Sequence, residues 1–344
     1  MIRRNKFDLY DLANLILDHL PEKVFKSKTT KFLDPAMGGG QFCHAIEDRL
    51  RRYGHSDENI SQRVFGFESV IMDIRFAVNK YNLVGQYSLV KPTTFLETET
   101  WGMKFDVIVG NPPFQRGDYA AKRWTLWDKF VERSLELADI TAMVTPQSIT
   151  SPGPFKLIKD KVKIINIDVS KHFDVGSTFC YFVAENKTNK GKATIITDEG
   201  KYKLDVKQLD FLPFVFNQDT LDKMEWLMNR ESRTWKRGEF HTSNKDKFST
   251  RGKYEVIHTN AQTLKTSIKH ENIDKVRVCV SLSGYPTFQV IKGKGCSQAT
   301  VWTEFNTLKE AREFAKECND EFIQSIMAEF KWSGWNSKEV ISHL

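Results

Sequence analysis

Two periodicities alternate along the first two thirds of the chain, one typical of strands and one typical of helices. Short runs rich in β-branched and aromatic residues predict strands at residues 31–34, 64–68, 87–90, 105–110, 140–145, 163–169, 178–184 and 193–197. Apolar residues at helical spacing predict helices at 7–20, 41–53, 70–81 and 126–137. This alternation indicates a mainly parallel sheet with helices on both faces, and we expect the last two strands to form an antiparallel pair at its edge.

The pattern changes beyond about residue 216. Short strand-like runs at 254–258, 276–281, 287–291 and 300–303 lie among polar stretches, and a helix is predicted from 308 to about 330. We therefore expect an α/β domain over residues 1–215 and a smaller α+β domain over residues 216–344.

The distribution of charge along the chain indicates what kind of partner the protein binds. The 344 residues carry a net charge of +7, and residues 228–294 alone hold 14 Lys and Arg against 6 Asp and Glu, an excess of +8. A solvated surface could account for this, but a local excess larger than the whole chain's net charge favours a polyanion-binding face.

The cysteine pattern and the lack of long apolar segments indicate the cellular compartment of the protein. The 5 cysteines are scattered, without C-x-x-C spacing, and indicate reduced thiols rather than disulfides or a zinc site. The first residues lack the apolar core of a signal peptide, and no apolar run approaches membrane-spanning length. We expect a cytoplasmic protein with no membrane contact.

Two motifs at predicted strand ends indicate a nucleotide-like ligand. The strand 31–34 ends at Asp34, three glycines follow at 38–40, and a helix then begins. Glycines there let the backbone approach a ligand at the carboxyl edge of an α/β sheet, although an ordinary flexible turn could have the same composition. Glu68, at the end of the second strand, could accept hydrogen bonds from both ribose hydroxyls.

The segment Asn111-Pro112-Pro113-Phe114 follows the strand 105–110 and indicates the reaction. The two prolines end the strand and stiffen the backbone after it. The Asn111 side-chain oxygen and the Pro112 carbonyl are then two fixed acceptors for the hydrogens of a planar amino group, whose nitrogen lone pair becomes available for attack. Phe114 offers a face on which a flat base can stack. The alternative is a rigid loop with a core phenylalanine.

Together these motifs resemble those of the gamma-class, TaqI-like adenine-specific DNA methyltransferases, and the resemblance extends over nearly the whole chain. It implies a Rossmann-like class I methyltransferase sheet, S-adenosylmethionine as the cofactor, and a C-terminal target-recognition domain that contacts phosphates and base edges. No metal is implied. Asn111, Pro112, Pro113 and Phe114 are the implied catalytic residues.

The implied cofactor-binding residues are Tyr10, Asp34, Pro35, Ala36, Gly38, Gly40, Glu68, Thr94, Phe95 and Asn111. The glycine turn would hold the methionine part and Glu68 the ribose. Thr94 stands where the family has aspartate, which puts that contact in doubt, whereas Phe95 could pack on the adenine. Phe7 and Tyr10 occupy the place of the motif that closes over the methionine, and a core role is equally open.

The resemblance also implies contacts with the substrate. Phe114 would stack on a flipped base, and a second ring would come from Phe179 or Phe182, which lie on opposite faces of one strand; we favour Phe179. Candidate DNA contacts are Arg230, Arg233, Lys236 and Arg237, with Trp235 among them, although a solvated surface strip explains any single one equally well. Segments 278–285 and 331–336 resemble parts of recognition domains.

The predicted function is therefore methyl transfer to the N6 amine of an adenine flipped out of double-stranded DNA. Two alternatives stay open: an amino-methyltransferase acting on RNA or on a protein glutamine, and a DNA-binding protein with an inactive methyltransferase fold. We expect a monomer in a bacterial or phage-infected cell. It could act alone or beside a separate cognate restriction endonuclease, and the recognition sequence is not predicted.

Overall fold

The computed structural model describes residues 9–97, 102, 104–114, 126–173, 177–187, 191–241, 248–249, 251–332 and 334–344. Contacts divide the chain into an N-terminal unit, Met1–Ile149 with Gly153–Asp210, and a C-terminal unit, Thr150–Pro152 with Phe211–Leu344. The final change of unit, between Asp210 and Phe211, falls a few residues before the predicted domain boundary at 215. Among the described residues, no helix is both long and apolar enough to cross a membrane.

The N-terminal unit is built on one sheet of nine strands in the order β3-β2-β1-β4-β5-β7-β6-β8-β9. The first five strands run parallel, and β7 runs antiparallel between β5 and β6. The strands are β1 (Phe32–Asp34), β2 (Val64–Glu68), β3 (Gln86–Leu89), β4 (Phe105–Gly110), β5 (Ala138–Pro146), β6 (Val162–Asn166), β7 (Phe179–Glu185), β8 (Lys192–Ile196) and β9 (Lys201–Asp205). The predicted α/β class is therefore confirmed.

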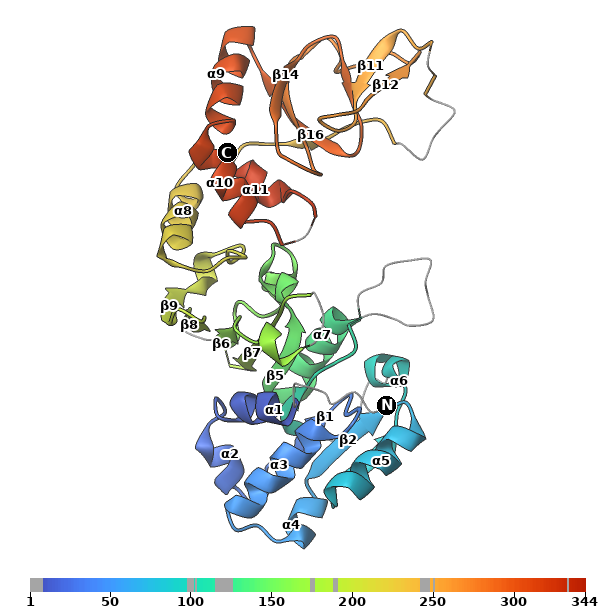
Figure 1. Cartoon of the computed structure of the whole chain (residues 1–344), viewed down its shortest axis with the longest axis vertical. Coiled ribbons are helices and arrows are strands. Elements are labelled where there is room, and N and C mark those ends of the chain that lie inside the picture. Colours follow the sequence, from blue (N-terminus) through green and yellow to red (C-terminus); the bar gives the residue numbers. More distant parts are fainter. Residues whose placement is uncertain are drawn as a thin grey trace. The chain divides into compact units, whose positions relative to one another are not determined.

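Helices cover both faces of this sheet (Figure 1). They are α1 (Leu9–Leu17), α2 (Glu22–Lys26), α3 (Gln41–Arg52), α4 (Asp57–Ser61), α5 (Ile71–Tyr81), α6 (Pro92–Glu97) and α7 (Trp127–Leu137). Apolar residues of α1, α2 and α3 form one buried cluster with the side chains of β1, β4, β5 and β7 that point to their face. On the other face, Phe95 of α6 stacks on Phe130 of α7 and meets Phe67 of β2 edge-on.

The edge beyond β5 differs from the prediction. Strands 178–184 and 193–197 were expected to pair with each other, but β8 instead pairs parallel with β6 and antiparallel with β9. The sequence patterns of two neighbouring strands do not specify which partner each takes. Strand β9 was not predicted, because its lysine-rich sequence has only Tyr202 and Leu204 as inward-facing apolar residues, as is common for an exposed edge strand.

The C-terminal unit has two small sheets, in the orders β10-β16-β13-β14 and β12-β11-β15. Its elements are α8 (Gln218–Met228), β10 (Lys236–Arg237), β11 (Tyr254–Ile257), β12 (Thr263–Thr266), β13 (Val276–Ser281), β14 (Phe288–Ile291), β15 (Gly295–Cys296), β16 (Thr300–Phe305), α9 (Leu308–Cys318), α10 (Glu321–Glu329) and α11 (Lys338–Ser342). The single helix predicted from 308 to about 330 is broken, because Asp320 caps a new helix by accepting a hydrogen bond from the Phe322 amide (3.0 Å).

Candidate active site

The ends of three neighbouring strands meet at one edge of the N-terminal sheet. Strand β1 lies between β2 and β4, and Asp34 pairs in register with Gly66. A Cβ atom added to Gly110, the last residue of β4, would lie 2.6 Å from Asp34 Oδ1. Asp34, Glu68 and Asn111 are therefore gathered at the carboxyl edge, where open α/β sheets bind ligands.

The glycine turn between β1 and α3 has the backbone that its sequence predicts. Gly38 (φ +47°) and Gly40 (φ +79°) both lie in the left-handed region that favours glycine. A Cβ on Gly40 would come within 2.6 Å of the Ala77 Cβ on α5, whereas one on Gly38 would meet no heavy atom within 4 Å. Gly40 is thus needed for helix packing, and Gly38 presents bare backbone on an open side.

Glu68 ties this turn to the end of β2. Its Oε2 accepts a hydrogen bond from the Gly38 amide (2.9 Å), and its Oε1 accepts from the amides of Ser69 (2.6 Å) and Val70 (3.0 Å). The carboxylate is therefore held in place beside the glycine turn. Its predicted contact with ribose hydroxyls stays a prediction.

Asp34 is the buried charge of the site. Its side chain is 1% exposed, and its Oδ1 accepts a hydrogen bond from the Ala36 amide (3.1 Å). Burial, with a smaller contribution from the charge of Glu68, raises the pKa of Asp34 to about 7. Near neutral pH this carboxyl group exchanges readily between its protonated and ionised forms.

Asn111 carries an acceptor atom that the described part of the chain leaves unused. Its Oδ1 is buried and has no hydrogen-bond partner there. Leaving such an atom unsatisfied costs roughly 1–3 kcal/mol, and a donor on a bound ligand would satisfy it. Pro112 beside it is buried, in keeping with a rigid turn after β4.

Aromatic rings lie next to this turn. Phe114 contacts Phe179, the first residue of β7, with ring centroids 4.9 Å apart and planes inclined by 32°. Phe182 lies on the opposite face of β7, as strand alternation requires, and is fully buried. This placement corrects the prediction for Phe182, and of the two rings only Phe179 reaches Phe114.

The other predicted cofactor residues are placed less favourably. Phe95 is 0% exposed between Phe67 and Phe130, so it presents no face on which an adenine could pack, which corrects that prediction. Thr94 precedes it on α6. Tyr10 donates a hydrogen bond from its hydroxyl to Asp48 Oδ2 (2.6 Å) and thus holds α1 on α3. Phe7 lies outside the described residues.

Sequence analysis overlooked two apolar residues that follow Glu68 and Ser69. Val70 and Ile71, at the start of α5, are 46% and 45% exposed although both are aliphatic. The Val70 amide donates to Glu68 Oε1, so this exposed aliphatic pair lies beside the acidic residue. An aliphatic pair separated from the acidic residue only by Ser69 was the signal available in the sequence.

In the C-terminal unit, two of the predicted DNA contacts are engaged internally. Arg230 donates to Glu317 Oε1 (2.9 Å), and its guanidinium lies 4.7 Å from the centre of the Trp226 ring. The Arg233 guanidinium lies 4.7 Å from the centre of the Phe305 ring, and four glutamates line the hollow that it shares. Trp235 is 3% exposed and belongs to the core, which corrects its prediction. Arg230 is half-buried by its contacts and Arg233 is exposed, and for both the contact with DNA stays a prediction.

Lys236 and Arg237 are exposed, as a DNA contact requires. They form β10 at the edge of the four-stranded sheet, with Lys236 opposite Trp302. Together with Lys275 they line a surface hollow that also contains His270 and two glutamates, Glu239 and Glu271. The contact of these two residues with DNA stays a prediction.

The two segments that resemble recognition domains come together in the structure. Ser283 forms a bridge with Trp335, and the buried Asn336 side chain donates to the Ser281 carbonyl oxygen (2.9 Å). Tyr285 and Trp335 are 66% and 53% exposed on this joined loop. Exposed aromatic rings on a hydrogen-bonded loop are candidates for contact with a partner.

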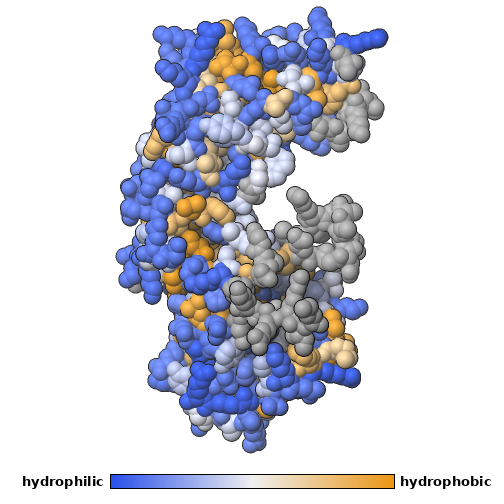
Figure 2. All heavy atoms as spheres, viewed as in Figure 1, coloured by the Kyte–Doolittle hydropathy of each residue, from blue (hydrophilic) through white to orange (hydrophobic). Residues whose placement is uncertain are grey.

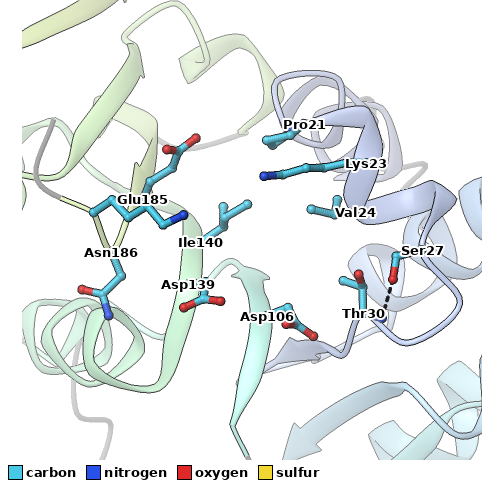
Figure 3. Close-up of a pocket in the computed structure, with 11 residues that line it drawn as sticks. Pro21, Lys23, Val24, Ser27, Thr30, Asp106, Asp139, Ile140, Glu185 and Asn186 are labelled. Carbon is cyan, nitrogen blue, oxygen red and sulfur yellow. Dashed lines mark hydrogen bonds between the residues drawn. The ribbon is translucent and has the colours of Figure 1, made fainter. Parts of the chain in front are cut away.

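A cavity of about 300 Å³ lies at the opposite edge of the sheet (Figure 3). It is lined by Asp106 and Asp139, near the amino ends of β4 and β5, and by Glu185 at the end of the antiparallel β7. Lys23 reaches into it from α2. This is the edge at which α/β sheets do not usually bind their ligands, and we assign no ligand to it.

The described residues contain neither a metal site nor a disulfide. They contain no cluster of three or more His, Cys, Asp or Glu that could hold a metal. All 5 cysteines are buried and free of disulfides, as expected of reduced thiols. On the face drawn in Figure 2 the surface is mostly hydrophilic, with apolar residues in separate patches.

Comparison with known proteins agrees with this geometry. Residues 44–181 match the family model described as Eco57I restriction-modification methylase. The matched segment runs from α3 to β7 and includes Glu68, the Asn111–Phe114 turn and Phe179. The match confirms the predicted resemblance to restriction-modification methyltransferases. No curated protein matches the chain in sequence.

Solved structures agree on the fold. The DrdV–DNA complex is 12% identical, with 91% of this chain and 51% of that chain covered and a TM-score of 0.53, and it confirms the predicted fold class. A modification subunit of a type I restriction enzyme from Vibrio vulnificus is 13% identical over 56% of this chain and 47% of that chain (TM-score 0.43). The type IIG enzyme BpuSI is 10% identical over 97% and 57% (TM-score 0.47). The chain spans about half the length of the first structures that it matches.

Proposed function

We propose that this protein is an adenine-specific DNA methyltransferase that transfers the methyl group of S-adenosylmethionine to the N6 amine of a flipped-out adenine. The buried, unpartnered Oδ1 of Asn111 carries this proposal. It is a fixed acceptor at the carboxyl edge of the sheet, beside an aromatic ring, where an amino group on a flat base would satisfy it.

The residues at this edge fit the cofactor. Gly38 offers bare backbone on an open side, Glu68 is fixed beside it, and the buried Asp34 carboxyl lies beneath the end of β4. We assign the methionine part to the glycine turn and Asp34, the ribose to Glu68, and the adenine to Val70 and Ile71. When bound, the cofactor supplies an electrophilic methyl group on a sulfonium ion.

The chain's own residues position the amine rather than deprotonate it. Asn111 Oδ1 and the Pro112 carbonyl accept the two N6 hydrogens, which draws the nitrogen towards tetrahedral geometry and frees its lone pair. Phe114 stacks on the base and orients the amine for in-line attack. The amine loses a proton to solvent once it has been methylated, so the site needs no histidine or cysteine as a base.

DNA is the substrate that the comparisons favour, because the matching family model is a restriction-modification methylase and the similar DrdV structure is a complex with DNA. The exposed Lys236 and Arg237, together with the loop carrying Tyr285 and Trp335, give the C-terminal unit a surface for phosphates and bases. RNA and protein glutamine find no comparable support. We further propose a monomer that works where the DNA is, in the cytoplasm of a bacterial or phage-infected cell, alone or beside a separate restriction endonuclease.

The decisive experiment incubates the purified protein with S-adenosylmethionine and unmethylated genomic DNA, followed by single-molecule sequencing for modified adenines. Methylation of one short repeated motif is expected, and it would also reveal the recognition sequence. The Asn111→Ala variant serves as the negative control. Unmodified DNA after incubation with a protein that binds the cofactor by calorimetry would refute DNA as the substrate.

A further inference from the structure

A third phenylalanine stands behind the ring pair of the candidate base pocket. The Phe173 ring packs on Phe179 with centroids 4.4 Å apart and planes inclined by 35°. Phe179 in turn contacts Phe114, so the three rings form a continuous row with Phe179 in the middle. The Phe114–Phe179 separation falls at the short end of the range for aromatic rings in contact, roughly 4.5–7 Å, and the Phe173–Phe179 separation is just below it.

The backbones of Phe173 and Phe179 are joined through one serine. The Ser170 hydroxyl accepts a hydrogen bond from the Phe179 amide (3.0 Å), and the Ser170 carbonyl accepts one from the Phe173 amide (3.0 Å). Ser170 begins the short 3₁₀ helix Ser170–His172. A residue of the segment before β7 thus fixes the first residue of β7, where the strand would otherwise fray.

The position of Phe179 matters because it lies directly against Phe114. A base stacked on Phe114 would lie close to the Phe179 ring, and a ring free to rotate would let the base sample several positions. Small errors in the placement of a reacting group lower rates strongly. A ring packed on its far side, and a backbone amide anchored by a hydroxyl, both limit that freedom.

We propose that Phe173 and Ser170 are positioning residues for the target base, acting through Phe179. They touch neither the base nor the cofactor. Their role is to hold Phe179 as the rigid wall of the pocket, so that a base stacked on Phe114 presents its amine to Asn111. This inference rests on the proposed function and adds to it the residues that fix the pocket wall.

The test compares Phe173→Leu, which keeps bulk but removes the ring, with Phe173→Tyr, which keeps the ring. Single-turnover methyl transfer is measured on a duplex that contains the recognition motif found by sequencing. The same duplex with 2-aminopurine at the target reports on stacking. We expect Phe173→Leu to slow transfer about three- to tenfold, the range for one aromatic contact, and to raise the 2-aminopurine fluorescence. The dissociation constants for cofactor and DNA should stay within about twofold, and Phe173→Tyr should restore transfer.

Two further variants separate positioning from general loss of stability. Ser170→Ala should slow transfer by about two- to fivefold, the worth of one hydrogen bond, whereas Ser61→Ala on α4 should leave it unchanged. Phe155→Leu removes a fully buried ring outside the aromatic row, so it should lower the melting temperature without changing the fluorescence of the flipped base.

The outcomes distinguish this inference from the proposed function. A Phe173→Leu enzyme with wild-type rate and fluorescence overturns the inference, as does an equal loss of rate in Phe155→Leu. Weaker cofactor binding as the main effect would also overturn it. If the wild-type enzyme methylates no adenine in DNA, the proposed function itself is wrong and the inference falls with it.

Discussion

The carboxyl edge of the N-terminal sheet and the basic segment of the C-terminal unit were both predicted to bind ligands. The predicted residues come together in the first region but not in the second. At the sheet edge, Asp34, Glu68 and Asn111 come together although more than 70 residues separate the first from the last. In the basic segment, Arg230 pairs with Glu317 and Arg233 lies over the Phe305 ring. The exposed Lys236 and Arg237 also have neighbours in their own unit, the Trp302 ring and the Gln298 carbonyl oxygen.

The difference lies in what each prediction was based on. Residues that follow consecutive parallel strands must meet at one edge, because the topology of the sheet places them there. A count of basic residues carries no such constraint, since arginine pairs equally well with a glutamate or an aromatic ring of its own unit. Position after a strand was therefore a stronger indicator than local charge, and the two regions can be set against each other by experiment.

The largest effect is expected at Asn111. Asn111→Ala removes the acceptor that would hold the amine and should lower the rate of methyl transfer by about 10³-fold, as loss of a transition-state hydrogen bond does in other enzymes. The dissociation constant for the cofactor, measured by calorimetry, should change little. A folded variant that no longer binds the cofactor would show that Asn111 has a different role.

Gly110 tests whether the edge is as closely packed as the structure indicates. Gly110→Ala would place a Cβ 2.6 Å from Asp34 Oδ1, and we expect a loss of about 1–3 kcal/mol in the free energy of unfolding, together with weaker cofactor binding. Gly334→Ala is the matched control, because its Cβ would meet no heavy atom within 4 Å. Denaturant unfolding measures both, and equal stabilities would argue against the close approach of β4 to Asp34.

Asp34 should make cofactor binding depend on pH. Its pKa of about 7 in the folded protein, against an ordinary 3.8, means that the folded state retains a proton that the unfolded chain has lost. Its contribution to stability is therefore present below pH 4, is lost as pH rises from about 4 to about 7, and is constant above.

Binding of the cofactor should follow the opposite trend. The ionised carboxylate attracts the methionine ammonium group, so affinity should rise with pH, by at most about tenfold per unit, and level off above pH 7. Calorimetry between pH 6 and pH 8 measures this. Asp34→Asn should bind more weakly and lack the rise; an equal slope in the variant would assign the titration to another group.

The sequence predicted most of the N-terminal unit because its signals are local. Strand, turn and helix patterns around the glycine turn and Asn111 each lie within about a dozen residues, and the structure keeps them. Pairing between distant strands has no such signal, which explains why β8 was assigned the wrong neighbour. Phe173 was missed for the same reason, since its contact with Phe179 depends on a short 3₁₀ turn.

Burial explains the predictions that failed inside the site. Phe95 was chosen by its place in a motif, and Phe182 was the less favoured of two rings on one strand; aromatic residues on a sheet covered on both faces are most often core residues. Both are 0% exposed. Val70 and Ile71 are the converse case, because two aliphatic residues at a helix start would ordinarily be assigned to the core, yet both are exposed.

The smallest effects are expected in the C-terminal unit, where two pairs of basic residues can be compared directly. Lys236→Ala with Arg237→Ala should weaken DNA binding several-fold and lower the slope of log affinity against log salt by about one for each lost phosphate contact. Arg230→Ala with Arg233→Ala should leave that slope unchanged and lower the melting temperature, because these side chains hold α9 and its neighbours together. Fluorescence anisotropy at several salt concentrations measures both pairs. Equal salt slopes for the two double variants would mean that internal partners do not prevent an arginine from binding DNA. Local charge would then predict the DNA-binding surface as well as strand position predicts the ligand-binding edge of the sheet.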